Sequence, residues 1–246
     1  MWVWILLYSL ALLALLGAVG GWLVHRSEHH NQFLFQRLLD PEDRRRRMLG
    51  CLERIAAVLD RHGISYWLDQ GTLLGAYRHQ GFIPWDMDID IAIESTSHER
   101  LWALRGELEP PYRLIQVSKL WMADKLLPFL RHLIPRRTFL RLVDFRTGEF
   151  VDIFEYRPDG DQGMEALPWT LTNYRATEET RTGATALRTH PREQIFPLDK
   201  TLEFEGAAYP VPAQTEAYLH HVYGDDLSPD REWSEEAGAY VKKVSQ

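Results

Sequence analysis

Apolar residues recur along the chain at two different spacings. Between Asp40 and Gly63, leucines and isoleucines return every three or four positions, which is typical of one face of a helix. Asp40 followed by Pro41 favours a helix start at this point, and Gly63 favours its end. Elsewhere, short runs rich in β-branched and aromatic residues predict strands.

The remaining pattern predicts a sheet with helices around it. Residues 158–195 show no clear period, and we expect a long loop region with some helix there. The order of helices and strands predicts an α+β (mixed α/β) domain. We expect strands at 64–68, 89–93, 112–117, 139–145 and 150–156, a hairpin of 201–204 with 208–211, and helices at 72–79, 95–108 and 213–223.

The N-terminal segment differs from the rest, because residues 1–24 contain no charged side chain. An apolar helix of about 20 residues crosses a bilayer, and the run from Trp2 to Val24 is long enough. A cleaved signal peptide is the alternative, but no basic residue precedes the run. We therefore predict one transmembrane helix at 1–24 and a connector at 25–40.

The flanking charges predict how such an anchor is oriented. Arg26, Arg37 and the run 44–47 follow the apolar segment, whereas no cation precedes it. The positive-inside rule then places the body of the protein on the cytoplasmic side. The alternative is a lumenal, Golgi-type enzyme, which would carry its positive charge ahead of the anchor. The basic and apolar stretch 119–137 could lie on the membrane surface, or it could be a core helix.

Composition excludes several classes of protein. The 246 residues suffice for one domain, which we place at 41–225 and which is followed by an acidic tail at 226–246. A formal net charge of −7 argues against bulk electrostatic binding to nucleic acid. The single cysteine, Cys51, excludes a disulfide framework within the chain and a cysteine-rich zinc site. Glycine signatures of dinucleotide folds, P-loops and serine hydrolases are absent from the sequence.

Candidate chemistry is concentrated in three alternating aspartates, Asp86, Asp88 and Asp90. In an extended strand, residues two apart share a face, so Asp88 and Asp90 would present two carboxylates side by side. Two such carboxylates repel each other, and a hard divalent cation such as Mg²⁺ or Mn²⁺ removes that penalty. The alternative is a solvated strand face rich in aspartate.

A second feature precedes these aspartates. Gly71 and Thr72 follow a strand and open a helix, a position at which backbone amides bind phosphate. Arg78, on the same helix, and Lys119, after a later strand, could also reach a phosphate, although both could equally be surface residues. A phosphate cradle followed by paired carboxylates is the layout of a metal-assisted phosphoryl-transfer site.

The full pattern G-T-L-L-G-x-x-R-x-x-x-x-I-P-W-D-x-D-x-D resembles the LicD family of the nucleotidyltransferase superfamily. Gly71–Arg78 and Ile83–Asp90 match it without a gap, and weaker matches extend the resemblance over roughly 64–225. Two positions depart from related patterns: Thr72 replaces the superfamily's usual serine, and Met87 stands where some relatives carry an acid. The resemblance implies a nucleotidyltransferase-like sheet with flanking helices.

The resemblance also implies an activity and a metal site. It implies Mg²⁺- or Mn²⁺-dependent transfer of phosphocholine or a polyol phosphate from a CDP-linked alcohol to a glycan or lipid-linked glycan, at a membrane. Asp88 and Asp90 would hold the metal, assisted by Asp86, and Asp152 would be the third carboxylate with Asp144 in reserve. Two alternatives stay open: nucleotidyl transfer from an NTP, and a catalytically silent membrane scaffold.

Overall fold

The computed structural model describes residues 40–86, 88–118, 138–159, 163–166, 189–229, 231–236 and 239–243. The expected anchor at 1–24, nearly all of the connector, and Lys119 with the stretch 119–137 lie outside these residues. None of the described helices is both long enough and apolar enough to span a membrane. The chain divides into two compact units, and the fold and site below belong to the unit made of 45–116 and 139–246.

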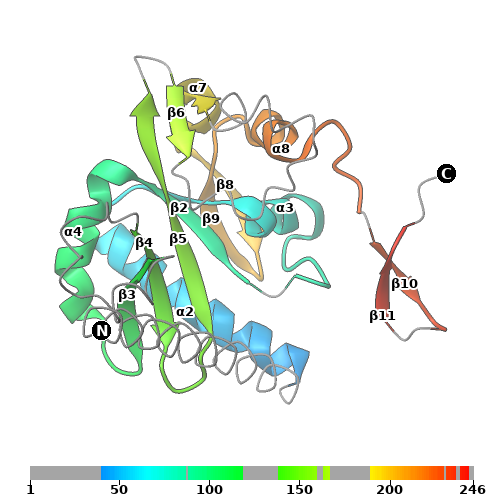
Figure 1. Ribbon diagram of the computed structural model, residues 1–246, viewed down its shortest axis with the longest axis horizontal. Helices are drawn as coiled ribbons and strands as arrows, with labels where there is room; N and C mark the ends of the chain where they lie inside the picture. The colour runs from blue at the N-terminus through cyan, green and yellow to red at the C-terminus, as the bar shows by residue number, and fades with distance from the viewer. Residues whose placement is uncertain are drawn as a thin grey trace, which may run out of the picture. The chain divides into compact units, whose positions relative to one another are not determined.

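A mixed sheet of seven strands forms the centre of the described structure, which confirms the α+β prediction (Figure 1). β2 pairs with β5 in parallel and with β1 antiparallel, whereas β5 is antiparallel to β4 and β6. β3 completes one edge beside β4 and β1 completes the other beside β2, whereas β6 lies off this order, pairing with β5 and with β7. The strands are β1 (Tyr66–Leu68), β2 (Asp90–Glu94), β3 (Tyr112–Ser118), β4 (Thr138–Asp144), β5 (Phe150–Asp159), β6 (Gly163–Ala166) and β7 (Thr189–Pro191).

Helices and two small hairpins surround this sheet. The helices are α2 (Pro41–Arg61), α3 (Gln70–His79), α4 (His98–Ala103), α7 (Arg192–Ile195) and α8 (Thr215–Tyr223), with short 3-10 helices at Ser95–Ser97 and Leu104–Glu107. The hairpins are β8 (Lys200–Phe204) with β9 (Ala207–Val211) and β10 (Arg231–Ser234) with β11 (Ala239–Lys242).

Most of the expected elements are confirmed, and three differ. The helix expected at 95–108 is divided into α4 and two 3-10 segments, because its serines and threonine favour tight turns over a continuous helix. The stretch 158–195 contributes β6, β7 and α7, whose short strands carry too few residues to show a period. The acidic tail contains the β10–β11 hairpin.

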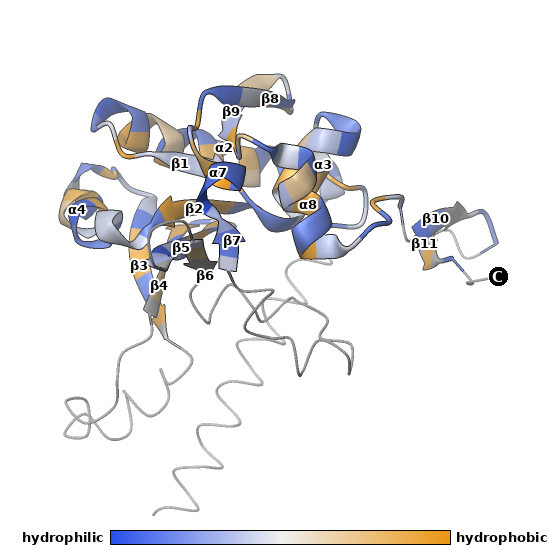
Figure 2. Ribbon diagram, turned by 90° about the horizontal axis from the view of Figure 1, so that it is seen from above, coloured by the Kyte–Doolittle hydropathy of each residue, from blue (hydrophilic) through white to orange (hydrophobic). Residues whose placement is uncertain are grey.

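The core lies between α2 and the sheet. Met48, Leu52, Ile55 and Leu59 recur on one face of α2 and are at most 1% exposed. β2 is apolar on both faces because β1 and β5 flank it and helices cover it, so it reads as a continuous apolar run. Figure 2 shows hydrophobic residues concentrated on this strand. The strand that carries the site is therefore rigidly held.

The turn between α3 and β2 is fixed by the β8–β9 hairpin. Gln80 ends α3 in the left-handed region with a φ of 56°. A Cβ on Gly75 would stand 2.5 Å from the carbonyl oxygen of Gly81, so the helix and the turn touch at their backbones. Glu205, in the hairpin turn, accepts a hydrogen bond from the Phe82 amide at 2.9 Å and donates its own amide to the Gln80 carbonyl at 2.9 Å.

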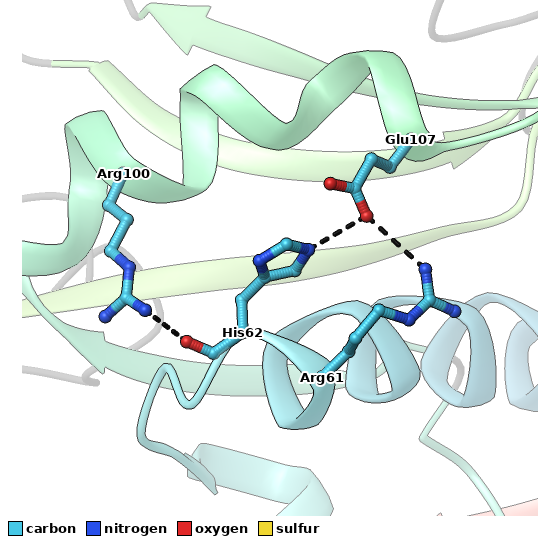
Figure 3. A network of polar contacts seen from close by, with 4 residues as sticks. All are labelled: Arg61, His62, Arg100 and Glu107. Atoms are coloured by element: carbon cyan, nitrogen blue, oxygen red, sulfur yellow. Dashed lines mark hydrogen bonds and ion pairs between the residues drawn. The ribbon is translucent and has the colours of Figure 1, made fainter.

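A polar cluster joins the end of α2 to the helical segment after β2 (Figure 3). His62 Nε2 and Arg61 Nη1 lie 2.9 and 3.3 Å from Glu107 Oε2, and Arg100 donates to the His62 carbonyl. The His62 hydrogen bond lowers the pKa of Glu107. Because these groups are largely solvent-exposed, the cluster orients the segment more than it stabilises the fold.

Candidate functional site

The three aspartates lie where the turn after α3 enters β2. Asp86 stands in the turn, Asp88 precedes the strand, and Asp90 is its first residue. Asp88 and Asp90 were expected to share one strand face, but only Asp90 belongs to the strand, since Asp88 lies ahead of β2. Asp90 is 3% exposed, and its register partner on the parallel strand β5 is Asp152. The fold thus brings Asp152 beside Asp90, from 62 positions away in the sequence.

These carboxylates destabilise one another. Burial raises the pKa of Asp90 well above its usual range, and the charges of Asp88, Asp152, Asp86 and Asp69 raise it further. Within the described residues, Asp90 Oδ1 is buried and has no hydrogen-bond partner. A buried charge that lacks a partner is costly, and a cation is the direct way to satisfy it.

Asp152 differs from the other acids because it is already paired. Arg141, its register partner on β4, donates from Nε to Oδ1 at 2.5 Å and from Nη2 to Oδ2 at 2.8 Å. The Arg141 guanidinium also stacks 3.8 Å from the ring centre of Phe150, which fixes its position. Burial raises the pKa of Asp152, and Arg141 opposes that shift. Both carboxylate oxygens are therefore engaged.

The fit to a metal ion can be judged from these donors. Asp88 and Asp90 supply hard oxygen ligands, and the unpartnered Oδ1 of Asp90 is a ready acceptor for a cation. Across the described segments, however, no three His, Cys, Asp or Glu side chains are arranged as a formed metal site. Asp152 would join such a site only if Arg141 gave up at least one of its two hydrogen bonds to the Asp152 carboxylate. Asp88 and Asp90 thus fit as metal ligands, and Asp152 becomes a third ligand only if the Arg141 side chain moves.

Asp144 occupies a different place from Asp152. It closes the turn between β4 and β5, where its Oδ1 accepts from the Arg146 amide at 2.8 Å and its Oδ2 from Arg146 Nη2 at 3.3 Å. The structure therefore places Asp152, and not the reserve candidate, beside the acids of β2. Nearby Cys51 is buried, and burial raises the pKa of its thiol to about 12, so it is not an activated nucleophile.

Gly71 and Thr72 open α3 beside these acids. An ideal Cβ on Gly71 would stand 2.2 Å from Asp86 Oδ2, so glycine is needed for that carboxylate to approach the helix. The Thr72 hydroxyl accepts a hydrogen bond from the Asp90 amide at 2.8 Å. Thr72 is 4% exposed, so in the structure it fixes the start of β2 rather than facing solvent.

A buried network behind α3, which no sequence signal indicated, ties the site together. Asp69, the N-cap of α3, accepts from the Gln70 amide at 2.9 Å, the Tyr156 hydroxyl at 2.9 Å and the Tyr218 hydroxyl at 2.6 Å. Its own amide donates to the Asp90 carbonyl at 3.1 Å. Burial raises the pKa of Asp69, and the three hydrogen bonds oppose the shift. Asp69 thus joins α3, β5 and α8 through its carboxylate and β2 through its amide.

Asp86, Asp88 and Asp90 face a cavity of about 710 Å³, whereas Asp152 is not among the residues that line it. Gly71 and Arg78 contribute to its walls from α3, and Trp85 contributes from the turn, but Thr72 does not line it. Arg78 Nη2 also donates to the Ser228 carbonyl at 2.9 Å, so one of the N–H donors of this arginine holds the C-terminal segment. Further lining comes from that segment, including Tyr223, which belongs to one of the weaker downstream matches to the family pattern but was not predicted as a site residue.

Comparison with known proteins finds relatives that are similar to this chain over short stretches. The lipopolysaccharide cholinephosphotransferase LicD of Haemophilus influenzae is 48% identical over 52 residues, which are 21% of this chain and 20% of that protein. The human ribitol 5-phosphate transferase FKRP is 44% identical over 52 residues, or 21% of this chain and 10% of that protein. The mouse ribitol-5-phosphate transferase FKTN is 36% identical over 62 residues, or 25% and 13%.

The aligned stretches span a fifth or less of the length of these relatives. A family model described as the LicD/FKTN/FKRP nucleotidyltransferase domain matches residues 63–214, which is more than half of the chain. That range contains the first turn of α3 and the acids Asp86, Asp88 and Asp90, which form the floor of the cavity. It also contains β2 and β5, the strands that bring Asp90 and Asp152 together. On this match, the chain belongs to the LicD family.

Proposed function

We propose that this protein transfers a phospho-alcohol, phosphocholine or a polyol phosphate, from a CDP-linked donor to a hydroxyl of a glycan. The observation that carries the proposal is the cavity floor, where Asp86, Asp88 and Asp90 lie beside Gly71 at the start of α3. Relatives named for cholinephosphate and ribitol-phosphate transfer support this choice of phospho-alcohol.

Asp88 and Asp90 would hold Mg²⁺ or Mn²⁺ through carboxylate oxygens. A divalent cation at this position supplies charge neutralisation for phosphates and a template for the attacking and leaving oxygens. The backbone amides at the start of α3, next to Gly71, would orient a donor phosphate with the help of the helix dipole. These residues would thus hold the donor with its diphosphate over the acids.

In the proposed reaction, the oxygen of the glycan hydroxyl bonds to the phosphorus that carries the alcohol. The bond from that phosphorus to the bridging oxygen of the diphosphate breaks, CMP leaves, and a phosphodiester forms. Asp152, which pairs with Asp90 across β2 and β5, would accept the proton of the hydroxyl on one carboxylate oxygen once Arg141 releases that oxygen. Arg141 would keep its hydrogen bond to the other oxygen and so orient the carboxylate.

Thermal shift with Mg²⁺ or Mn²⁺ and one nucleotide at a time tests the donor class. We expect CDP-choline or CDP-ribitol to raise the melting temperature in the presence of the cation, because a ligand that binds only the folded state stabilises it. Asp90→Asn should abolish this shift, whereas Asp199→Asn, at an exposed position outside the cavity, should keep it. A shift with CTP alone would favour nucleotidyl transfer, and no shift with any nucleotide would favour a silent scaffold.

We also propose that residues 1–24 anchor the protein in a membrane with the catalytic body on the cytoplasmic side. The uncharged run and the arginines that follow it support this orientation. A lipid-linked glycan would then meet the enzyme at the membrane surface. Protease added outside intact spheroplasts should leave the body uncut, and digestion there would instead support the lumenal alternative.

A further inference from the structure

One side of the cavity comes from outside the segment that matches the family model. The match ends at residue 214, yet the end of α8 and the chain that follows it also line the cavity. Figure 1 shows this chain leaving α8 and running to β10. We call residues 222–229 together with Arg231 the C-terminal wall; its lining residues are Val222, Tyr223, Asp226, Ser228 and Arg231.

The C-terminal wall is held by specific contacts. The Ser228 amide donates to Asp226 Oδ1 at 2.8 Å, which closes a tight turn, and Arg78 Nη2 donates to the Ser228 carbonyl at 2.9 Å. The Ser228 hydrogen bonds lower the pKa of Asp226, and the charges of Arg78 and Lys243 lower it further. Since Arg78 lies on α3, the same helix that opens with Gly71 also positions the wall.

The charges that face the cavity are unequal. Four acids line it, Asp86, Asp88 and Asp90 on the floor and Asp226 in the wall, against two arginines, Arg78 and Arg231, among the described lining residues. Arg78 is engaged by the wall itself. The Arg231 guanidinium has no hydrogen bond or ion pair to any residue that the structure describes. It therefore offers a positive charge and five N–H donors at the wall of the cavity.

We propose that Arg231 binds a phosphate of the nucleoside-diphosphate donor, which makes the C-terminal wall a specificity-determining part of the site. The planar guanidinium matches two phosphate oxygens, and it adds positive charge to a cavity that Asp86, Asp88 and Asp90 make acidic. The inference rests on the proposed function, because it assumes a nucleoside-diphosphate donor. It adds a residue that lies beyond the family match and at the start of β10.

Calorimetric titration of CDP into the full-length protein with Mn²⁺ tests this role. We expect Arg231→Gln to weaken CDP binding about tenfold or more, which is the effect of losing a charge-assisted hydrogen bond. Arg231→Lys should recover part of the affinity, because it keeps the charge but loses the planar fork. Arg113→Gln, an exposed arginine that does not line the cavity, should bind CDP as the wild type does.

A second titration with Mn²⁺ alone separates ligand binding from structural damage. If Arg231 contacts the donor, Arg231→Gln should keep the wild-type affinity for Mn²⁺ while it loses affinity for CDP. Wild-type CDP affinity in Arg231→Gln, or an equal loss of CDP and Mn²⁺ binding, would overturn the assignment of Arg231 and leave the proposed function standing. Absence of CDP binding by the wild-type protein with Mn²⁺ would overturn the donor class and this assignment together.

Discussion

Substitution of Gly71 by alanine should impair the site without unfolding the protein. An ideal Cβ at this position would stand 2.2 Å from Asp86 Oδ2, well inside van der Waals contact. The carboxylate must then retreat by about 1 Å, and misplacements of this size at an active site can lower the rate about a hundredfold. Alanine gains about 1 kcal/mol of helix propensity over glycine, against a crowding cost of about 1–3 kcal/mol. The net loss of unfolding free energy should therefore stay below about 2 kcal/mol.

A double-mutant cycle with Asp86→Ala identifies the cause. Mn²⁺ affinity and transfer rate would be measured for Gly71→Ala, for Asp86→Ala and for the double variant, with urea unfolding as the check on stability. Once Asp86 is shortened, the methyl group of Ala meets no carboxylate, so Gly71→Ala should add little further loss. A wild-type rate in Gly71→Ala, or the same loss in both backgrounds, would show that glycine is not needed there to accommodate Asp86.

Two further predictions concern stability. Gly75→Ala should lower the free energy of unfolding by about 1–3 kcal/mol in urea titration, because its Cβ would stand 2.5 Å from a backbone carbonyl oxygen. Gly106→Ala, whose Cβ would meet nothing within 4 Å, is the matched control and should not show this loss. The Glu155 hydrogen bond raises the pKa of His98, so this pair stabilises the fold fully below the unfolded pKa of histidine and loses that contribution as the pH rises through the folded value. Unfolding free energies measured on both sides of that range should therefore fall with rising pH more in the wild type than in Glu155→Gln, and equal slopes would contradict the assignment.

Much of the fold could be predicted because its signals are local. The apolar face of α2 and its capping residues stand within one stretch, and so do the Gly71 turn and the three aspartates of the floor. The position of Asp88 could not be foreseen, since alternation suggested that Asp88 and Asp90 share one strand face. β2 begins only at Asp90, so Asp88 lies outside the strand. The residues Ile91–Ile93 are all buried, so they form a continuous apolar run.

The parts that sequence reasoning missed depend on long-range pairing. Arg141 meets Asp152 only because β4 and β5 are register partners, and nothing in the sequence marks that pair. Asp69 and Tyr218 lie 149 positions apart, and only the packing of α8 against α3 and β5 brings them together. The C-terminal wall was hidden by its acidic composition, which is equally typical of a solvated tail.

Cation-dependent transfer of a phospho-alcohol at Asp88 and Asp90 can be followed by ³¹P NMR of a single reaction. The full-length protein would be incubated with CDP-choline or CDP-ribitol, a glycan acceptor and Mg²⁺ or Mn²⁺. We expect the diphosphate signals to give way to CMP and a phosphodiester, and we expect chelation of the cation to stop the reaction. Asp88→Asn and Asp90→Asn should fall below about a tenth of the wild-type rate, which is a barrier increase above about 1.4 kcal/mol. Asp199→Asn should react at the wild-type rate. Phosphodiester formation that persists in Asp88→Asn or Asp90→Asn would contradict the proposed metal site. Release of pyrophosphate from CTP, in place of CMP from the CDP-linked donor, would contradict transfer of a phospho-alcohol.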